Sequence, residues 1–335
     1  MNTLSITDVK GLSVGHAHDK KALTGCSVVM CKNGAVAGVS QRGGAPGTRE
    51  TDLLRPMRAV QKVHAIMLAG GSAYGLDAAG GVMQYLEEND IGYRVGPNIV
   101  PIVPSAILYD LDIGDSAIRP NKEMGYQACL RANESPPLSG NVGAGTGATV
   151  GKILGMSQAM KSGIGSAAIE IGNGIIIGAI IAVNAFGDII ENEKIIAGAR
   201  TIKKGPLKIG SDPLFANTRE VMQSFAGRQI LSFASRQNTV IGVVGTNAEI
   251  TKEEANYLAD VASNGLSHVI RPAFTMFDGD TIFTMATGQV KADINLVAAY
   301  AQDVVAEAIL NAVKSANSVG DFPAFSGFLE TNDVN

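Results

Sequence analysis

Short apolar runs, each ended by turn residues, recur along the chain. Several of them are rich in Val and Ile, and they occupy residues 27–30, 65–68, 175–183, 239–244 and 282–286. Strands that are buried on both faces have near-continuous apolar sequences of this kind, and β-branched residues favour extended backbone. The pattern therefore predicts a set of short buried strands.

Apolar residues at helical spacing predict three helices. Thr251 followed by Glu254 is a capping-box signature at the start of one of them. Residues 296–316 carry apolar positions along one side and predict a second, long helix. Residues 72–88 predict a third. Because strands and helices are both plentiful, the fold class is α/β (α+β) with a layered core.

One long stretch differs from the rest of the chain. Residues 191–237 are more polar, contain Pro206 and Pro213, and precede the apolar run at residue 239. Loops of such length are uncommon unless they are functional or mobile. We expect a long surface excursion here.

Composition excludes several classes of function. The 335 residues are 46% hydrophobic and 17% charged, which suits a large buried core. The net charge is −4 and no basic tract stands out, so neither a nucleic-acid partner nor an anionic membrane is expected. Three cysteines and four histidines show no metal-ligand spacing, and we expect neither a metal nor a cofactor. Free thiols and the lack of a signal-peptide pattern suit the cytoplasm.

A glycine-rich segment invites a phosphate-loop interpretation. It runs from Gly143 to Gly147 and continues to Gly151 and Lys152. A phosphate loop requires Gly five residues before Gly151 and a hydroxyl residue after the lysine, and neither condition is met. We instead predict a turn whose backbone approaches a catalytic centre, with Lys152 reaching in.

The segment Gly70-Gly-Ser-Ala-Tyr-Gly75 resembles a nucleophile elbow. The elbow requires Gly where Tyr74 stands, and no histidine presents itself as a partner base. Ser72 is better explained as a helix N-cap than as a nucleophile.

Polar residues at the ends of apolar runs are the remaining candidates. Asp278 and Asp280 stand two residues apart, so on extended backbone they share a face. They form a solvated turn, or a metal pair for which no His or further carboxylate is nearby in the sequence, or they lie opposite a hydroxyl, an ammonium or Lys152. Asn184 is either a structural cap or a donor to an oxyanion. Tyr109 is either a packing residue or part of a site. By themselves, Asn238 and Thr239 look like an ordinary strand start.

Taken together, these segments resemble the DmpA-type aminopeptidases, also called L-aminopeptidase/D-esterases, a family that includes β-aminopeptidases and nylon-oligomer hydrolases. The resemblance covers nearly the whole chain. Its blocks, in family order, are VGHAHD, LAGGSAYGLDAAGGV, VPSAILYD, GNVGAGTGATVGK, AVNAFGD, QNTVIGVVGTNA and IRPAFTMFDGDTIFTMATG.

This resemblance implies a single domain over residues 1–335 with a four-layer αββα sandwich, similar to N-terminal nucleophile hydrolases. It implies self-cleavage between Asn238 and Thr239, giving a large fragment (1–238) and a small fragment (239–335). Thr239 would then act as nucleophile, as in the nylon-oligomer hydrolase branch. The implied remainder of the site is Asn184, Lys152, Tyr109, Asp278 and Asp280.

The implied activity is hydrolysis of short peptides, amino-acid amides or related oligoamides through an acyl-enzyme on Thr239, in a homo-oligomer. Tyr109 and Asn184 would donate to the oxyanion, and Lys152 would hold the nucleophile. Two alternatives remain open. An acyltransferase of the ornithine-acetyltransferase type would depend on an added amine acceptor, and a non-catalytic scaffold would remain an uncut chain.

Overall fold

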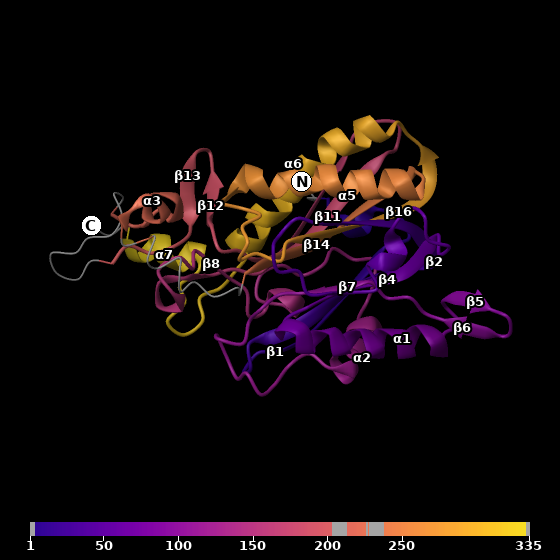
Figure 1. Cartoon of the computed structure of the whole chain (residues 1–335), viewed down its shortest axis with the longest axis horizontal. Coiled ribbons are helices and arrows are strands. Elements are labelled where there is room, and N and C mark those ends of the chain that lie inside the picture. The colour runs from indigo at the N-terminus through magenta and orange to yellow at the C-terminus, as the bar shows by residue number, and fades with distance from the viewer. Residues whose placement is uncertain (1–3, 203–212, 226, 228–237, 333–335) are drawn as a thin grey trace.

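The structure is a computed structural model that describes residues 4–202, 213–225, 227 and 238–332 (Figure 1). Its principal strands are β1 (Ser13–Asp19), β2 (Thr24–Gln41), β4 (Lys62–Ala69), β7 (Ser105–Ile107), β10 (Ile164–Glu170), β11 (Ile176–Asn184), β14 (Thr239–Glu249) and β16 (Thr281–Lys291). Shorter strands are β3 (Thr48–Arg49), β5 (Tyr93–Val95), β6 (Asn98–Val100), β8 (Thr149–Val150), β9 (Met160–Lys161), β12 (Asp188–Glu191), β13 (Lys194–Ala197) and β15 (Ile270–Arg271). The α-helices described in full are α1 (Ala78–Glu88), α2 (Lys122–Leu130), α3 (Thr218–Gln223), α5 (Lys252–Val269), α6 (Ile294–Lys314) and α7 (Phe325–Asn332).

One mixed sheet organises the molecule. Its strand order is β10-β11-β14-β16-β2-β4-β7-β3, with β1 also paired to β2. The long strand β2 joins two halves of this sheet, because its first part pairs with β1 and β4 and its last part pairs with β16. The two halves lie face to face, with α5 and α6 above one half and α1 and α2 below the other (Figure 1).

Three apolar clusters fill the spaces between these layers. The first lies between the α5–α6 pair and the sheet, the second between the two halves of the sheet, and the third between the sheet and the α1–α2 pair. Alternate residues of one strand enter different clusters: on β14, Val240 and Val244 face the helices, whereas Ile241 and Val243 face the other half of the sheet. The result is the αββα sandwich that the resemblance implied.

Helix α6 illustrates how this burial is achieved. By length and composition it could cross a membrane, but 56% of its apolar window is buried inside the protein. Its buried side packs with α5 over β10 and β11, as expected of a core helix.

The structure confirms the five predicted strands and the three predicted helical regions, with differences at their ends. The region predicted to be one helix over 72–88 begins as a 3-10 helix (Ser72–Asp77) before α1. The prediction that Ser72 is an N-cap is wrong: Gly71 holds that position with φ +80°, and Ser72 itself has φ +54°. Glycine adopts this left-handed conformation without steric cost, which explains why the cap lies there.

The predicted surface excursion over 191–237 is wrong in part. Its described portion contains β13 and α3, and Glu191 ends β12. Pro206 and most of the remainder lie outside the described residues. Asp188 organises this region, because its carboxylate accepts hydrogen bonds from the Ala199 N–H (2.9 Å) and the Thr218 N–H (2.6 Å). Hydrogen bonds to a buried carboxylate hold these short elements in place, and the sequence pattern does not show such bonds.

Candidate active site

Three neighbouring strands bring the predicted site residues to one edge of the sheet. Thr239 begins β14, and its Cα lies opposite that of Asn184, the last residue of β11. Strand β14 runs antiparallel to β11 and parallel to β16, so the end of β11 and the starts of the other two meet at the same edge. Asp280 lies immediately before β16. Strand pairing thus assembles residues that are far apart in the sequence.

Thr239 lies against the peptide bond that precedes it. Its side chain is buried, with an exposed fraction of 4%, and its hydroxyl donates to the carbonyl oxygen of Asn238. The N–H of Gly279 donates to the same carbonyl oxygen at 2.9 Å. The Asn238 carbonyl therefore carries a backbone donor on its oxygen and a hydroxyl beside it.

The two aspartates are buried, with exposed fractions of 2% for Asp278 and 3% for Asp280. Asp280 accepts from the Val240 N–H (2.8 Å) and the Phe274 N–H (3.2 Å). Asp278 accepts from both the N–H and the hydroxyl of Thr275, at 2.9 and 2.6 Å. Burial raises the pKa of both carboxyls, and repulsion from Asp278 raises that of Asp280 further. These residues form a buried pair, so the solvated-turn alternative is wrong.

Lys152 reaches this edge from the glycine-rich segment. The N–H groups of Gly151 and Lys152 donate to the carbonyls of Gly187 and Phe186, both at 3.1 Å, which fixes the backbone beside the end of β11. The Lys152 Nζ then donates to the Oδ1 of Asn184 at 2.6 Å. Burial lowers the pKa of Lys152 to about 7, although the nearby carboxylates, Asp278 first among them, oppose this shift.

Both ends of the Asn184 side-chain amide are engaged. Its Oδ1 accepts from Lys152 and from the Thr149 N–H (3.1 Å), and its Nδ2 donates to the carbonyl oxygen of Tyr109 at 2.9 Å. The Tyr109 hydroxyl donates to Asp112 at 3.1 Å, and burial together with this bond raises the tyrosine pKa. The structure thus connects Tyr109 to the site through its backbone, and a role for its hydroxyl as oxyanion donor stays a prediction.

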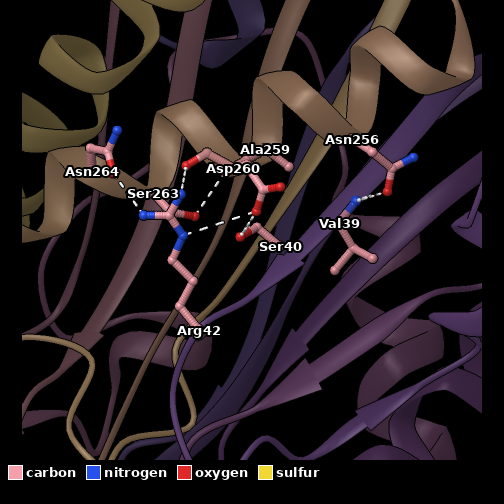
Figure 2. Close-up of polar contacts among 8 residues, drawn as sticks. All are labelled: Val39, Ser40, Arg42, Asn256, Ala259, Asp260, Ser263 and Asn264. Carbon is pink, nitrogen blue, oxygen red and sulfur yellow. Dashed lines mark hydrogen bonds and ion pairs between the residues drawn. The ribbon is translucent and has the colours of Figure 1, made fainter.

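Arg42 holds the segment that carries Asp278 and Asp280, called the aspartate loop below, to neighbouring elements. The N–H of Arg42, just after β2, donates to the Asp280 carbonyl at 3.0 Å. Figure 2 shows its guanidinium donating to Asn264 (2.7 Å) and to the Asp260 carbonyl (2.5 Å) on α5. The same guanidinium lies 5.6 Å from the ring centre of Phe274, whose N–H holds Asp280. Arg42 therefore ties the loop to both the helix layer and the sheet.

Sequence reasoning missed the parts of the site that belong to the backbone. The N–H of Gly279 carries no side-chain signal, although its position between the two aspartates was visible. Glycine is required there, because a Cβ would lie 2.5 Å from the Ala45 oxygen and 2.9 Å from the Thr239 hydroxyl. Gly43 is constrained in the same way, since a Cβ there would lie 2.2 Å from the backbone carbonyl oxygen of Asp278. Such close approaches become visible only once the strands are paired.

Comparison with known proteins connects this geometry to a family. The model of peptidase family S58 matches residues 4–324. An uncharacterized aminopeptidase of Mycobacterium leprae (strain TN) is 39% identical over 96% of this chain and 93% of its own length. A 6-aminohexanoate-oligomer endohydrolase of Kocuria sp. (strain KY2) is 30% identical over 92% of this chain and 85% of its own length.

Two solved structures share the fold. The L-aminopeptidase D-Ala-esterase/amidase of Ochrobactrum anthropi, described as a variant of the Ntn hydrolase fold, superposes with a TM-score of 0.71 at 17% identity, covering 95% of this chain and 88% of that one. A β-aminopeptidase of Burkholderia sp. gives 0.66 at 20% identity, covering 97% and 92%. At such identities the likeness shows the fold alone. The family match over nearly the entire length shows more: this chain belongs to peptidase family S58 and is a hydrolase of peptide or amide bonds.

Proposed function

We propose that this protein cleaves its own chain between Asn238 and Thr239 and then hydrolyses short peptides, amino-acid amides or related oligoamides with Thr239 as nucleophile. One observation carries the proposal: the buried hydroxyl of Thr239 lies against the carbonyl of Asn238, whose oxygen already accepts the Gly279 N–H. A hydroxyl, a carbonyl and an oxyanion donor are the three parts that acyl transfer requires.

Self-cleavage begins with attack by the Thr239 hydroxyl oxygen on the Asn238 carbonyl carbon. The carbonyl oxygen becomes negative and is stabilised by the Gly279 N–H, whose 2.9 Å distance suits an oxyanion donor. The carbon–nitrogen bond then breaks, and the hydroxyl proton passes to the leaving nitrogen of Thr239. Water hydrolyses the resulting ester, leaving a carboxylate on Asn238 and both a free hydroxyl and a free amine on Thr239.

The new amine changes what Thr239 can do. As an amide its nitrogen cannot accept a proton, but as an α-amine it has a reference pKa of roughly 7.7–8.0. It can therefore take the proton from its own hydroxyl when that hydroxyl attacks a substrate carbonyl. The acyl group forms an ester on Thr239, the amine product leaves, and water regenerates the enzyme. The substrate carbonyl would occupy the place that Asn238 leaves, within reach of the same Gly279 N–H.

During both reactions, Lys152 would exchange protons and the aspartate pair would hold the nucleophile in place. A lysine with a pKa of about 7 is partly neutral near neutral pH and can exchange a proton there. Asp280 would fix the start of β14 through the Val240 N–H, and so hold Thr239 in place. Asn184 would hold Lys152 beside the nucleophile. The proposal requires no cofactor, and its partners would be a small amide substrate and the protein's own cleaved fragment, within a cytoplasmic homo-oligomer.

The test compares Thr239→Ala with Thr246→Ala, a second buried threonine on the same strand. Wild type and Thr246→Ala should give two fragments on a denaturing gel, and mass spectrometry should identify Thr239 as the first residue of the smaller one. Thr239→Ala should remain one chain and lose at least about a thousandfold in amide hydrolysis. An uncut wild type that is fully active would refute the proposal, and a rate that depends on an added amine would indicate acyl transfer instead.

A further inference from the structure

A second buried lysine lies near enough to Lys152 for their charges to interact, and the mechanism above does not use it. Lys161 on β9 is fully buried, with an exposed fraction of 0%. Its Nζ donates to three backbone carbonyls: Gly145 at 3.2 Å, Ala148 at 2.9 Å and Ser162 at 2.5 Å. An ammonium has three N–H donors, so these carbonyls match its full hydrogen-bonding capacity.

Stability alone does not explain this lysine. Burying an ammonium carries a large desolvation cost, and an apolar side chain of similar volume is often neutral or stabilising in its place. Two of the three carbonyls also have another donor, because the Ala148 N–H donates to Gly145 (3.2 Å) and the Ser162 N–H donates to Ala148 (3.0 Å). Removing the ammonium would therefore leave these two carbonyls hydrogen bonded.

The contact with Ala148 leads directly to the site. The peptide bond between Ala148 and Thr149 accepts from Lys161 on its carbonyl side, and on its amide side the Thr149 N–H donates to the Asn184 Oδ1 at 3.1 Å. A cation at the oxygen polarises a peptide and strengthens the hydrogen bond that its N–H donates. Lys161 thus acts on the Asn184 oxygen through one rigid peptide.

The other end of the Asn184 amide also rests near Lys161. Its Nδ2 donates to the carbonyl of Tyr109, and the next residue is the buried Asp110. Burial lowers the pKa of Lys161 to about 7, and the charge of Asp110 opposes this shift and favours the ammonium form. Asp110 is held in turn by the Gly71 N–H at 2.6 Å. The Thr149 N–H therefore belongs to a peptide whose carbonyl binds Lys161, and the Tyr109 carbonyl precedes a carboxylate whose charge acts on Lys161.

The orientation of this amide matters because its two ends differ. A flipped Asn184 would turn its NH₂ toward the Lys152 ammonium and the Thr149 N–H, both of which are donors. We propose that Lys161 is a positioning residue that fixes the Asn184 amide orientation, and thereby the place of Lys152 beside Thr239. This inference rests on the proposed function, since it assigns Asn184 and Lys152 to that chemistry.

The test uses Lys161→Met with Lys252→Met as its matched control. Lys252 is the same kind of group: it is buried at the start of α5, and its Nζ donates to the carbonyls of Arg58 (2.9 Å) and Val60 (2.7 Å). Lys161→Met should lower kcat for amide hydrolysis about 10- to 100-fold, with KM within about twofold, and should slow self-cleavage similarly. Lys252→Met should leave kcat unchanged. Thermal unfolding should show both variants folded.

A double-mutant cycle separates positioning from general loosening of the fold. If Lys161 acts through Asn184, then adding Lys161→Met to Asn184→Ala should cause no further loss of kcat. Losses that multiply would overturn the inference, as would wild-type kcat in Lys161→Met. Should the Met variant not fold, Lys161→Gln, which is neutral but keeps a donor, replaces it in the same cycle, and wild-type kcat in that variant overturns the role of the ammonium.

The outcomes also distinguish this inference from the proposed function. If Thr239→Ala keeps its activity, the proposed nucleophile is wrong whatever Lys161 does. If Thr239→Ala is inactive while Lys161→Met behaves like Lys252→Met, the nucleophile stands and only the positioning role fails.

Discussion

Strands β14 and β16 lie side by side in parallel, and their two ends differ in what they bury. At the starting edge, Thr239 and Asp280 are polar yet almost inaccessible to solvent. At the far edge, β14 ends in the exposed Glu249 and the chain enters α5 through a capping box formed by Thr251 and Glu254. The same pair of strands therefore carries a buried polar edge and an ordinary solvated one.

The difference follows from desolvation. Each buried carboxyl at the starting edge loses its contact with water, and backbone N–H groups replace only part of that solvation, so its pKa rises. At the far edge, water solvates the charge of the exposed Glu249, so this charge carries no comparable desolvation cost. Strongly shifted pKa values cluster at functional sites, while buried groups such as Asp188 serve the fold. Matched substitutions at the two edges should therefore separate effects on activity from effects on stability.

Among the matched substitutions at the two edges, the largest effect is expected from Asp280→Asn. An amide would present NH₂ to one of two backbone donors, Val240 N–H or Phe274 N–H, and so displace the start of β14. We expect both self-cleavage and hydrolysis to fall by at least about a hundredfold. Glu249→Gln, at the other end of β14, should leave both rates unchanged. Timed denaturing gels and a chromogenic amide assay measure the two, and comparable rates in the two variants would contradict the contrast.

A smaller effect is expected from adding a methyl group at Gly279. Its Cβ would press on the Ala45 oxygen and on the Thr239 hydroxyl, so the nucleophile must shift. We expect Gly279→Ala to lose about 10- to 100-fold in self-cleavage and to accumulate as precursor. Gly288, also on β16, has φ +73° and open space around its Cβ, so Gly288→Ala should lower stability by about 1 kcal/mol while cleavage stays normal. Equal cleavage rates for the two alanine variants would argue against a close fit at Gly279.

The ordinary features of the fold could be predicted from the sequence. The capping box at Thr251 and Glu254 was predicted from two side chains three residues apart, and the structure forms it. The strand at 239–244 was predicted from its run of β-branched residues. Local chemistry determines such features, so local sequence is sufficient to find them.

The site depends instead on pairing between distant segments. Nothing around Asn238 and Thr239 distinguishes them from any strand start, and only the resemblance to a family pointed to that bond. The Gly279 N–H and the Ala148–Thr149 peptide are backbone groups without a residue-type signal. Lys161 stands in a short apolar context with no motif, so only the folded structure shows it buried against carbonyls.

A change of about tenfold per pH unit is expected in the cleavage of the precursor. Burial lowers the pKa of Lys152 to about 7, so the lysine is mostly protonated below that pH and mostly neutral above it. If the neutral form takes the hydroxyl proton and passes it on to the leaving nitrogen, the cleavage rate should rise toward pH 7 and then level off. The slow Gly279→Ala precursor, diluted into buffers from about pH 5.5 to 8.5, allows the measurement before the α-amine of Thr239 exists. A flat profile over this range would rule out Lys152 as the titrating group.

The smallest effect is expected at the solvated edge, from Thr251→Ala. The Thr251 hydroxyl accepts the Glu254 N–H at 3.2 Å, and the Glu254 carboxylate accepts the Thr251 N–H at 2.7 Å. Losing the hydroxyl should reduce the free energy of unfolding by about 1 kcal/mol, the usual value for an N-cap. Helix α5 also binds Arg42 through Asp260 and Asn264 (Figure 2). This variant therefore tests whether fraying at the start of the helix affects the aspartate loop. Those contacts lie two or more turns along α5, beyond the first turn that a cap supports, so denaturant unfolding should shift while kcat stays at its wild-type value.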